Sequence, residues 1–356
     1  MSKVKLGDVA IEHKETCKGS KDGYPIVGLE HLVSEEVTLT AWDEGNDNTF
    51  TKMFRKGNVL FGRRRAYLKK AAVAPFDGIC SGDITVIEAI PDRILPELLP
   101  FIIQNDELFD FAVGKSAGSL SPRVKWEHLK NYEFELPDMD KQRELAELLW
   151  AMDATKKSYQ KLIAATDELV KSQFMEQFFY SEKYQLVPIS SVVDRKIKKK
   201  KDISKDFEEI RYIDISSINN QSKRVTGYVE FPIDETPSRA QQVLEKGDIL
   251  ISTVRPNLQN IAVNPYSEEN VVASTGFCVL RCEKCLPEYI WGVITSEAFT
   301  NAMCEQASGI SYPAVRDSDI LQYLIPDAPI EIQEQFAAFV RQSDKSKYNA
   351  SQAMRL

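Results

Sequence analysis

The chain carries one pattern twice, at a spacing of about 190 residues, and this repeat constrains its fold more than any other feature. Residues 56–60 read KGNVL and residues 246–250 read KGDIL, and the surrounding windows align without a gap. Further on, residues 118–122 (GSLSP) correspond to residues 309–313 (GISYP). A repeat of this length is a whole domain and not the unit of a solenoid. The sequence therefore predicts two similar domains in tandem, which fits a length of 356 residues.

Each copy has the same predicted order of elements, in which strands come first and helices follow. Short apolar or alternating runs between Gly, Pro and Asn residues are typical of strands, and longer runs with helical periodicity come after them. Strands are predicted at residues 58–61, 71–74, 84–87, 248–252 and 276–280, and helices at residues 96–111 and 287–304. The expected fold class is α+β with a pseudo-two-fold internal repeat.

A long helix is predicted at the end of each copy, directly after a Leu-Pro or Ile-Pro pair. The first begins near Asp138, a suitable N-cap, and continues without Gly or Pro until after Tyr180. Its apolar residues recur about every 3.5 positions, which is typical of a coiled coil. The second begins at Ile330 and has a shorter apolar stripe. We expect the two stripes to pack on each other; the alternative is that each helix packs only on its own domain.

The motifs of common catalytic sites are missing from the sequence. It has no GxGxxG after a predicted strand, no GxxxxGK[ST], no HExxH and no GxSxG, and its three His residues leave no plausible catalytic triad. Residues 264–266 (NPY) resemble part of an amino-methyltransferase motif, but the corresponding residues 74–76 (APF) favour a structural turn. We therefore expect no catalytic residue on this chain.

The six Cys residues are expected to be reduced thiols, because the sequence has no export signal. Cys282 and Cys285 have half of the spacing of a zinc site, but no second CxxC follows and all three His residues lie in the other half of the chain. A strand followed by a loop is the favoured interpretation, and no metal site is expected.

Basic residues are concentrated in matching segments of the two copies, although the whole chain has a net charge of −8. Residues 48–76 contain eight Lys or Arg and no acid, while acidic residues gather at 30–47, 127–147 and 327–334. A run of charge is often only solvated surface, but two equivalent runs in a repeat favour a shared role. Guanidinium and amide side chains bind phosphates and the edges of guanine and adenine in the major groove.

We therefore predict a DNA-binding region in each copy, in which the basic segment accompanies a loop of small polar residues at 115–125 or 308–316. The candidate residues of the first copy are Lys52, Arg63, Arg64, Arg65, Tyr67, Lys69, Lys115, Arg123 and Lys125. Those of the second copy are Lys198, Lys199, Arg224, Arg255, Asn257, Gln259, Tyr312 and Arg316, and Arg195 belongs to the same basic run. Because positive charge is confined to these patches, the isolated chain is expected to bind DNA weakly.

The order of motifs is the same in both copies. A Lys-Gly-(Asp/Asn)-(Ile/Val)-Leu segment precedes a Gly-Ser or Ser-Gly loop, a Leu/Ile-Pro pair and a long helix that begins near Gln142 or Gln333. This doubled order resembles the specificity subunit of type I restriction-modification enzymes. The resemblance covers the chain from about Val4 to its C-terminus, and the order of the motifs makes it specific. The chain departs from many members of that family in being shorter, with an abbreviated terminal helix.

The resemblance implies a non-enzymatic subunit that reads a bipartite DNA target. Residues 1–137 and 183–326 would be two target recognition domains, and residues 138–182 and 327–356 would be two long antiparallel coiled-coil-like helices that separate them. The expected partners are double-stranded DNA, two methyltransferase subunits and two motor-nuclease restriction subunits. S-adenosylmethionine, ATP and Mg would then belong to the partner subunits, with no cofactor on this chain.

The sequence also predicts the cellular location. No apolar run approaches the roughly 18 residues of a spanning helix, and the charged first residues lack the apolar core of a signal peptide. No membrane contact is expected, and the cytoplasm is the expected location.

Three alternatives stay open. The chain could be a protein-interaction scaffold that uses its long helices and does not bind DNA. It could be the specificity subunit of a smaller, two-part type II-like restriction enzyme. An intrinsic methyltransferase is the least favoured, because no glycine-rich S-adenosylmethionine loop precedes residues 264–266.

Overall fold

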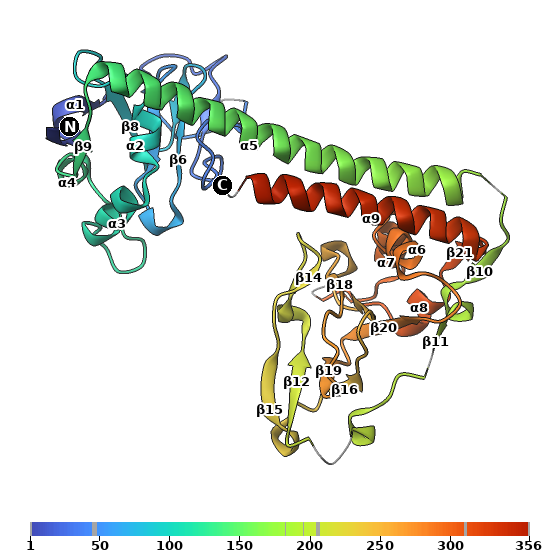
Figure 1. Ribbon diagram of the computed structural model, residues 1–356. Coiled ribbons are helices and arrows are strands. Elements are labelled where there is room, and N and C mark those ends of the chain that lie inside the picture. Colours follow the sequence, from blue (N-terminus) through green and yellow to red (C-terminus); the bar gives the residue numbers. More distant parts are fainter. Residues whose placement is uncertain are drawn as a thin grey trace. The chain divides into compact units, whose positions relative to one another are not determined.

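The computed structural model describes residues 2–44, 48–181, 183–194, 196–203, 207–309 and 312–354. The chain forms two compact units, Met1–Ser158 and Tyr159–Leu356 (Figure 1). The longest helix, α5 (Met139–Phe174), begins in the first unit and ends in the second.

The first unit contains a four-stranded antiparallel sheet, a three-stranded mixed sheet and a two-stranded pair. The four-stranded sheet has the order β2 (Ala10–Glu12), β8 (Ile84–Ala89), β5 (Val59–Gly62) and β6 (Ala71–Val73). The three-stranded sheet has the order β3 (Ile26–Val27), β7 (Gly78–Cys80) and β4 (Lys52–Phe54), in which β3 and β7 are parallel. The pair consists of β1 (Ser2–Lys5) and β9 (Glu133–Leu136).

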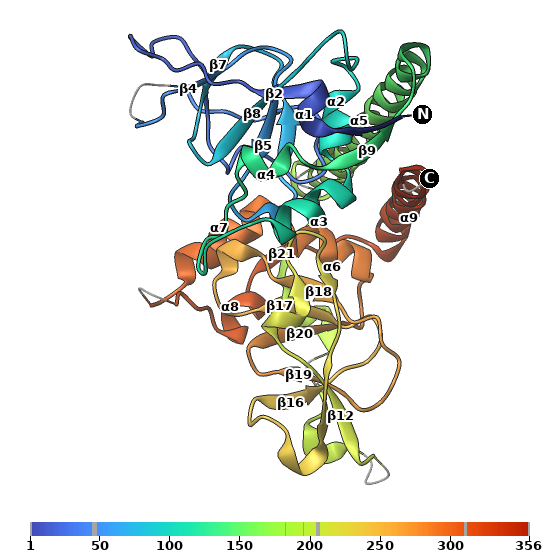
Figure 2. The ribbon, with the colours of Figure 1, turned by 90° about the vertical axis from the view of Figure 1, so that its left-hand side faces the viewer.

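The second unit contains the same three kinds of sheet, two of them enlarged. Figure 2 shows β17, β18 and β20 side by side. The six-stranded sheet has the order β11 (Val193–Asp194), β20 (Phe277–Cys282), β17 (Ile249–Ser252), β18 (Ile261–Val263), β14 (Arg224–Val225) and β13 (Ile218–Asn219). The four-stranded sheet has the order β15 (Val229–Pro232), β12 (Glu209–Ile213), β19 (Val271–Ser274) and β16 (Ala240–Val243). The pair consists of β10 (Leu186–Pro188) and β21 (Leu324–Pro326).

The strand orders confirm the tandem repeat that the sequence predicts. The order β2-β8-β5-β6 of the first unit corresponds to β11-β20-β17-β18 of the second, and β3-β7-β4 corresponds to β12-β19-β16. The parallel pair recurs at the matching place, as β3 with β7 and as β12 with β19. The second unit adds the β13–β14 hairpin to one sheet and β15 to the other.

Short helices complete both units. The first unit has α1 (Leu6–Val9), η1 (Ala66–Leu68), α2 (Leu99–Ile103), α3 (Asp106–Gly114) and α4 (Trp126–Leu129). In the second unit, α5 continues into the π-helical turn η2 (Met175–Phe179), and the other short helices are η3 (Ile189–Ser191), η4 (Lys200–Asp202), η5 (Ile215–Ser217), η6 (Ile233–Glu235), η7 (Pro256–Leu258), α6 (Pro287–Ile294), α7 (Glu297–Gln306) and α8 (Asp317–Leu321). The second long helix is α9 (Ile330–Ala353).

The two shorter helices predicted from the sequence are wrong as single elements, because each is broken into two. The stretch 96–111 is α2 and α3, separated at Asn105, whose side chain accepts a hydrogen bond from the N–H of Glu107 at 2.8 Å. The stretch 287–304 is α6 and α7, separated at Ser296, whose Oγ accepts from the N–H of Phe299 at 3.1 Å. Both residues satisfy a free N–H of the helix that follows, so a new helix begins there.

The repeated Lys-Gly pair is a turn that only glycine adopts readily. Gly57 has φ 89° and Gly247 has φ 93°, a left-handed conformation in which a Cβ is unfavourable. The N–H of Gly57 donates to the carbonyl of Ala74, and that of Gly247 to the carbonyl of Asn264, both at 2.9 Å. The turn therefore sets the start of β5 and of β17 in the same way.

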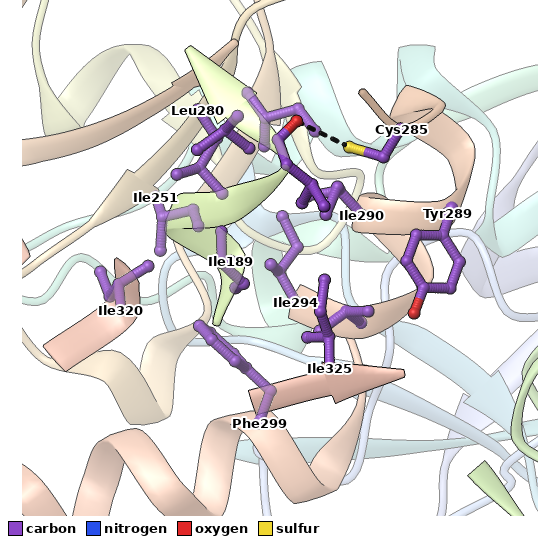
Figure 3. Close-up of a cluster of buried hydrophobic side chains, with 14 of the residues drawn as sticks. Ile189, Ile251, Leu280, Cys285, Tyr289, Ile290, Ile294, Phe299, Ile320 and Ile325 are labelled. Atoms are coloured by element: carbon purple, nitrogen blue, oxygen red, sulfur yellow. Dashed lines mark hydrogen bonds between the residues drawn. The ribbon is translucent and has the colours of Figure 1, made fainter. Parts of the chain in front are cut away.

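A buried aromatic cluster joins both long helices to the core of the second unit. Phe174 of α5 lies 5.3 Å from Phe336 of α9, and Phe178 lies 4.8 Å from Tyr289 of α6, measured between ring centroids. Figure 3 shows Tyr289, Ile290 and Ile294 in this core. Burying these rings removes large apolar areas from water, which stabilises the unit.

Within the second unit, the end of α5 and α9 lie side by side in opposite directions (Figure 1). Phe174 meets Phe336, and Asp167, earlier in α5, pairs with Lys347, later in α9, at 2.7 Å. Among the described residues, none of the helices is both long enough and apolar enough to cross a membrane.

A buried glutamine fixes the start of each long helix to its own unit. Gln142 accepts a hydrogen bond from the N–H of Leu95 at 2.8 Å and donates to the carbonyl of Pro137 at 2.9 Å. Gln333 repeats this arrangement with the N–H of Leu286 at 2.9 Å and the carbonyl of Ala328 at 2.8 Å. The two residues marked in the sequence as helix starts are therefore equivalent clamps.

Candidate nucleic-acid interface

Each unit has a short, strained turn directly after its central strand, which we call the arginine turn (residues 63–69 and 253–259). In the first unit, Arg65 and Lys69 have φ of 54° and 50°, and in the second unit Arg255 and Gln259 have φ of 52° and 48°. Left-handed backbone is unfavourable for residues other than glycine, at about 1 kcal/mol each. Its recurrence at equivalent positions shows that the turn has one fixed shape in both units.

A second loop holds each arginine turn in place, and we call it the glycine loop (residues 115–125 and 308–316, of which 310 and 311 lie outside the described residues). The N–H of Arg65 donates to the carbonyl of Pro122 at 2.8 Å, and the N–H of Arg255 to that of Pro313 at 2.7 Å. Gly118 and Gly309 have φ of 116° and 106°, so a residue with a Cβ would strain the loop.

Further backbone pairs join the two loops of each unit into one platform. In the first unit, Arg123 pairs with Ala117 and with Arg64, and in the second, Ala314 pairs with Ser308 and with Val254. In the first unit this platform joins the basic segment to the polar loop, as predicted, and in the second unit it joins the loop to the turn of Arg255.

Three charged side chains meet on the platform of the first unit. Arg123 donates to both carboxylate oxygens of Asp83, from Nε at 2.7 Å and from Nη2 at 3.3 Å. Arg64 approaches the same carboxylate with Nη1 at 3.4 Å and donates from Nε to Ser121 Oγ at 3.0 Å. The hydrogen bond from Arg123 lowers the pKa of Asp83, burial opposes this, and the charge of Arg64 lowers it further.

The side chains of the other candidates in the first unit differ in their solvent exposure and in their contacts with protein groups. Arg65, Tyr67 and Lys125 are exposed, and Lys125 stands at the start of α4. Arg63 is half-buried, and within the described part of the chain its Nε is buried without a hydrogen-bond partner. Three lysines are engaged with protein groups: Lys69 pairs with Asp106 at 2.6 Å, Lys115 lies 5.8 Å from the ring centre of Phe111, and Lys52 donates to the carbonyl of Ile84 at 2.8 Å.

On the platform of the second unit, an arginine lies over an aromatic ring. The guanidinium carbon of Arg255 is 4.6 Å from the ring centre of Tyr312, and both side chains are exposed. This cation–π contact orients the guanidinium group while its N–H donors face solvent. Asn257 is also exposed on the same turn.

Gln259 is engaged within the protein at both ends of its amide. Its Oε1 accepts from Lys223 Nζ at 2.9 Å, and its Nε2 donates to Thr300 Oγ1 at 2.6 Å. Asn220 of the β13–β14 hairpin also donates to the carbonyl of Leu258 at 3.2 Å. These contacts favour a role for Gln259 as an anchor of the arginine turn, because an amide bound at both ends has little capacity left for an adenine.

The structure does not bring all candidates of the second unit onto the platform. Lys198 and Lys199 run along β16, where the carbonyl of Lys198 accepts from the N–H of Val243 and Lys199 pairs with Gln242. Arg224 is exposed on β14, and Arg316 is exposed at the start of α8. Arg195 lies outside the described residues.

The sequence interpretation missed four residues that shape these sites: Asp83, Ser121, Lys223 and Thr300. Ser121 lies in the repeated GSLSP segment, whereas Asp83, Lys223 and Thr300 belong to no motif, and each of the four acts on a residue at least 19 positions away. Among those outside a motif, only the position of Asp83, directly before a predicted strand, gives a local signal.

The groups considered for metal binding or methyl transfer have structural contacts. Asn264 is buried, and its amide donates to the carbonyls of Glu245 and Tyr266 at 2.9 and 3.2 Å, which agrees with a structural turn. Cys285 donates to the carbonyl of Val192 at 3.5 Å, and its contact with Cys282 and its burial raise its pKa.

One group of possible metal ligands is found in the described part of the chain. Atoms of Glu30, His31 and Asp43 lie within 4.8 Å of one another. However, His31 Nδ1 accepts the N–H of Gly28 at 2.9 Å, so the neutral ring carries its proton on Nε2, 3.5 Å from Asp43. A nitrogen that carries a proton is not a metal ligand, and the geometry favours a structural His–Asp pair.

Comparison with known proteins gives one consistent family. A family model described as "Type I restriction modification DNA specificity domain" matches residues 1–165 and 181–352. The specificity subunit of the type I restriction enzyme MjaVIII from Methanocaldococcus jannaschii is 21% identical over 343 residues, which cover 90% of this chain and 75% of that protein.

Two solved structures share the fold. A chain from a structure described as the basis of complex assembly and conformational transition of the type I R-M system has a TM-score of 0.53 and 20% identity, over 99% of this chain and 95% of that one. A type I restriction-modification S subunit from M. genitalium has a TM-score of 0.55 and 13% identity, over 99% and 92%.

Proposed function

Because the chain belongs to the type I restriction-modification DNA specificity family, we propose that each of its units reads one half of a split DNA target through its platform. The observation that carries this proposal is the doubled platform. The same strained arginine turn is bonded to the same glycine loop in both units, although most side chains on the two platforms differ.

The chemistry of the platforms suits DNA. Exposed arginines, with five N–H donors in a rigid fork, bind phosphate or the O6 and N7 atoms of guanine. Two readers of different sequences need the same protein backbone with different side chains. Contacts to the DNA phosphates position each unit on the duplex, and the side chains that reach the base edges specify the sequence. The main proposed contacts are Arg64, Arg65, Arg123, Arg255 and Asn257.

We propose that the long helices separate the two readers. In this proposal the boundaries are those expected from the sequence. The recognition domains are residues 1–137 and 183–326, and the spacer helices are residues 138–182 and 327–356. In the second unit, the contacts between Phe174 and Phe336 and between Asp167 and Lys347 support antiparallel pairing of the helices.

The catalytic steps of restriction and modification are assigned to partner subunits. Specificity subunits of type I systems are non-catalytic, and we propose two methyltransferase subunits and two restriction subunits as partners. S-adenosylmethionine, ATP and Mg would bind to those partners. Leu162 and Leu169 of α5, both more than half exposed (54% and 56%), provide apolar surface for such docking.

The test is to map the DNA sequence that the assembled complex methylates. The complex is purified through a tag on this chain, so that its natural partners come with it. We expect two short specified segments separated by unspecified base pairs. A contiguous target, or no sequence preference at all, would contradict the proposal and would favour a scaffold that does not read DNA.

A further inference from the structure

One group of charges is present on the platform of the first unit and absent as a whole from the second. Arg64, Asp83 and Arg123 of the first unit correspond to Val254, Gly276 and Ala314 of the second. The backbone shows that these positions are equivalent. Arg64 pairs with Arg123 as Val254 pairs with Ala314, and Asp83 and Gly276 each accept, through their carbonyl, the N–H of the residue before Arg64 or Val254.

The turn does not need these charges in order to fold, because the second unit forms the same backbone with an aliphatic side chain, a glycine and an alanine. The three charges differ together between the units, which favours one shared role for them. That role is therefore carried by their side chains on the surface of the first unit.

The geometry leaves donors of both arginines available. Asp83 Oδ2 lies 3.3 Å from Arg123 Nη2 and 3.4 Å from Arg64 Nη1, so one carboxylate holds two guanidinium groups together. Within the described part of the chain, Arg123 Nη1 and Arg64 Nη2 have no hydrogen-bond partner. Both arginine side chains are about 40% exposed (39% and 40%), whereas Asp83 is 20% exposed.

We propose that Asp83 is a positioning residue that holds Arg64 and Arg123 so that their free N–H groups read a guanine-containing edge in one half of the target. This inference rests on the proposed function. Without the carboxylate, the two guanidinium charges would repel each other and move apart. The second unit positions Arg255 over Tyr312 instead, so the two halves of the target are read by different chemistry.

The experiment selects duplexes from a randomised DNA library with the complex purified through a tag on this chain. It compares the wild type with Asp83→Asn. The variant keeps an oxygen that accepts from Arg123 but loses the negative charge. We expect the preference for guanine to fall roughly tenfold, in one half of the target only. At the same time, binding to unrelated DNA should tighten, with a salt dependence steeper by about one unit, because one more positive charge faces phosphate.

Three further variants control this result. Asp92→Asn removes an exposed acid of the same unit and should leave the sequence preference unchanged. The triple variant Arg64→Val, Asp83→Gly, Arg123→Ala installs residues that the same backbone already accommodates in the second unit, and it should also lose the guanine preference. Tyr312→Ala should change the preference in the other half.

The outcomes separate the inference from the proposed function. If the wild type selects a split target and both Asp83→Asn and the triple variant keep its preference in both halves, the inference fails and the proposed function stands. An equal loss in both halves by folded variants would also overturn the inference, because Asp83 would then act on the whole assembly. If the wild type selects no split target, the proposed function itself fails.

Discussion

The carboxylate of Asp248, almost completely buried, receives two hydrogen bonds from the guanidinium group of Arg281, from Nε at 2.8 Å and from Nη2 at 2.7 Å. The same carboxylate accepts the N–H of Glu245 at 2.8 Å and thereby closes the turn before β17. In the first unit, Asn58 closes the equivalent turn with the N–H of Arg55 at 2.8 Å. An amide side chain is therefore sufficient to close the turn, and the negative charge of Asp248 is needed for the ion pair with Arg281.

Asp248→Asn should accordingly preserve the turn and destabilise the second unit. Arg281 would lose the buried negative charge that it pairs with, which costs roughly 3 kcal/mol. The measurement is the free energy of unfolding in urea. As a control, Glu245→Gln removes an exposed partner of Arg281 and should cost less than about 1 kcal/mol. Equal losses for the two variants would show that burial of the pair is not the determining factor.

Gly292→Ala should destabilise the protein even though alanine favours helices. A Cβ at Gly292 in α6 would lie 2.5 Å from two ring carbons of Phe174. That ring is fully buried and has four aromatic neighbours at 5.1 to 5.8 Å between ring centroids, so it has little room to move. We expect overpacking of about 1–3 kcal/mol to exceed the helix-propensity gain of about 1 kcal/mol.

The matched control for this variant is Gly114→Ala at the end of α3, where a Cβ would meet nothing within 4 Å. It should leave the thermal unfolding temperature unchanged or raise it. Phe174→Leu in the Gly292→Ala background should recover part of the loss. If Gly292→Ala is as neutral as Gly114→Ala, the packing of Phe174 against α6 is not as tight as described.

The repeat and the five strands that became β5, β6, β8, β17 and β20 could be predicted from the sequence because their signals are local. The Lys-Gly pairs mark turns that need a positive φ, and the apolar runs after them are strands buried on both faces. The breaks at Asn105 and Ser296 were missed because apolar periodicity continues across them, although both residues are good N-caps.

The platform chemistry could be predicted only in part. Basic segments and polar loops are visible in the sequence, and the structure joins them in the first unit. In the second unit the polar loop is joined to the turn of Arg255, while Lys198 and Lys199 run along β16. The partners of individual side chains depend on contacts over long sequence distances. Gln259 meets Lys223 and Thr300, and Arg123 meets Asp83, and these pairs are brought together only by the folded sheets. The DNA contacts themselves stay predictions.

The buried clamp at Gln333 should be sensitive to removal and to charge. Gln333→Ala would leave the N–H of Leu286 and the carbonyl of Ala328 without partners, at about 1–3 kcal/mol for each buried group. Gln333→Glu should cost more at neutral pH, because it places a carboxylate against the Ala328 carbonyl. The measurement is unfolding in urea, with the exposed Gln342→Ala on the same helix as the control. A variant at Gln333 that is as stable as the control would refute the clamp.

The cysteines should differ strongly in reactivity towards a thiol reagent at pH 8. Burial raises the pKa of Cys80 to about 12 and also raises that of Cys278. A raised pKa lowers the fraction of thiolate, which is the reactive form. Cys304, exposed on α7, should react first, and Cys80 and Cys278 should react only in urea. Peptide mass spectrometry identifies the labelled residues, and labelling of native Cys80 as fast as Cys304 would contradict its burial.

Arg255 and Tyr312 should contribute to DNA binding in separable ways. Arg255→Ala removes one charge from the platform of the second unit, so the affinity of the assembled complex for DNA should fall and its salt dependence should flatten by about one unit. Tyr312→Phe keeps an aromatic ring under the guanidinium group and should bind almost like the wild type. Tyr312→Ala keeps the charge but frees the arginine, so the salt dependence should be unchanged while the preference between DNA sequences falls. Binding titrations at several salt concentrations measure all three. If Tyr312→Ala and Tyr312→Phe behave alike, the stacked ring does not orient Arg255 for reading.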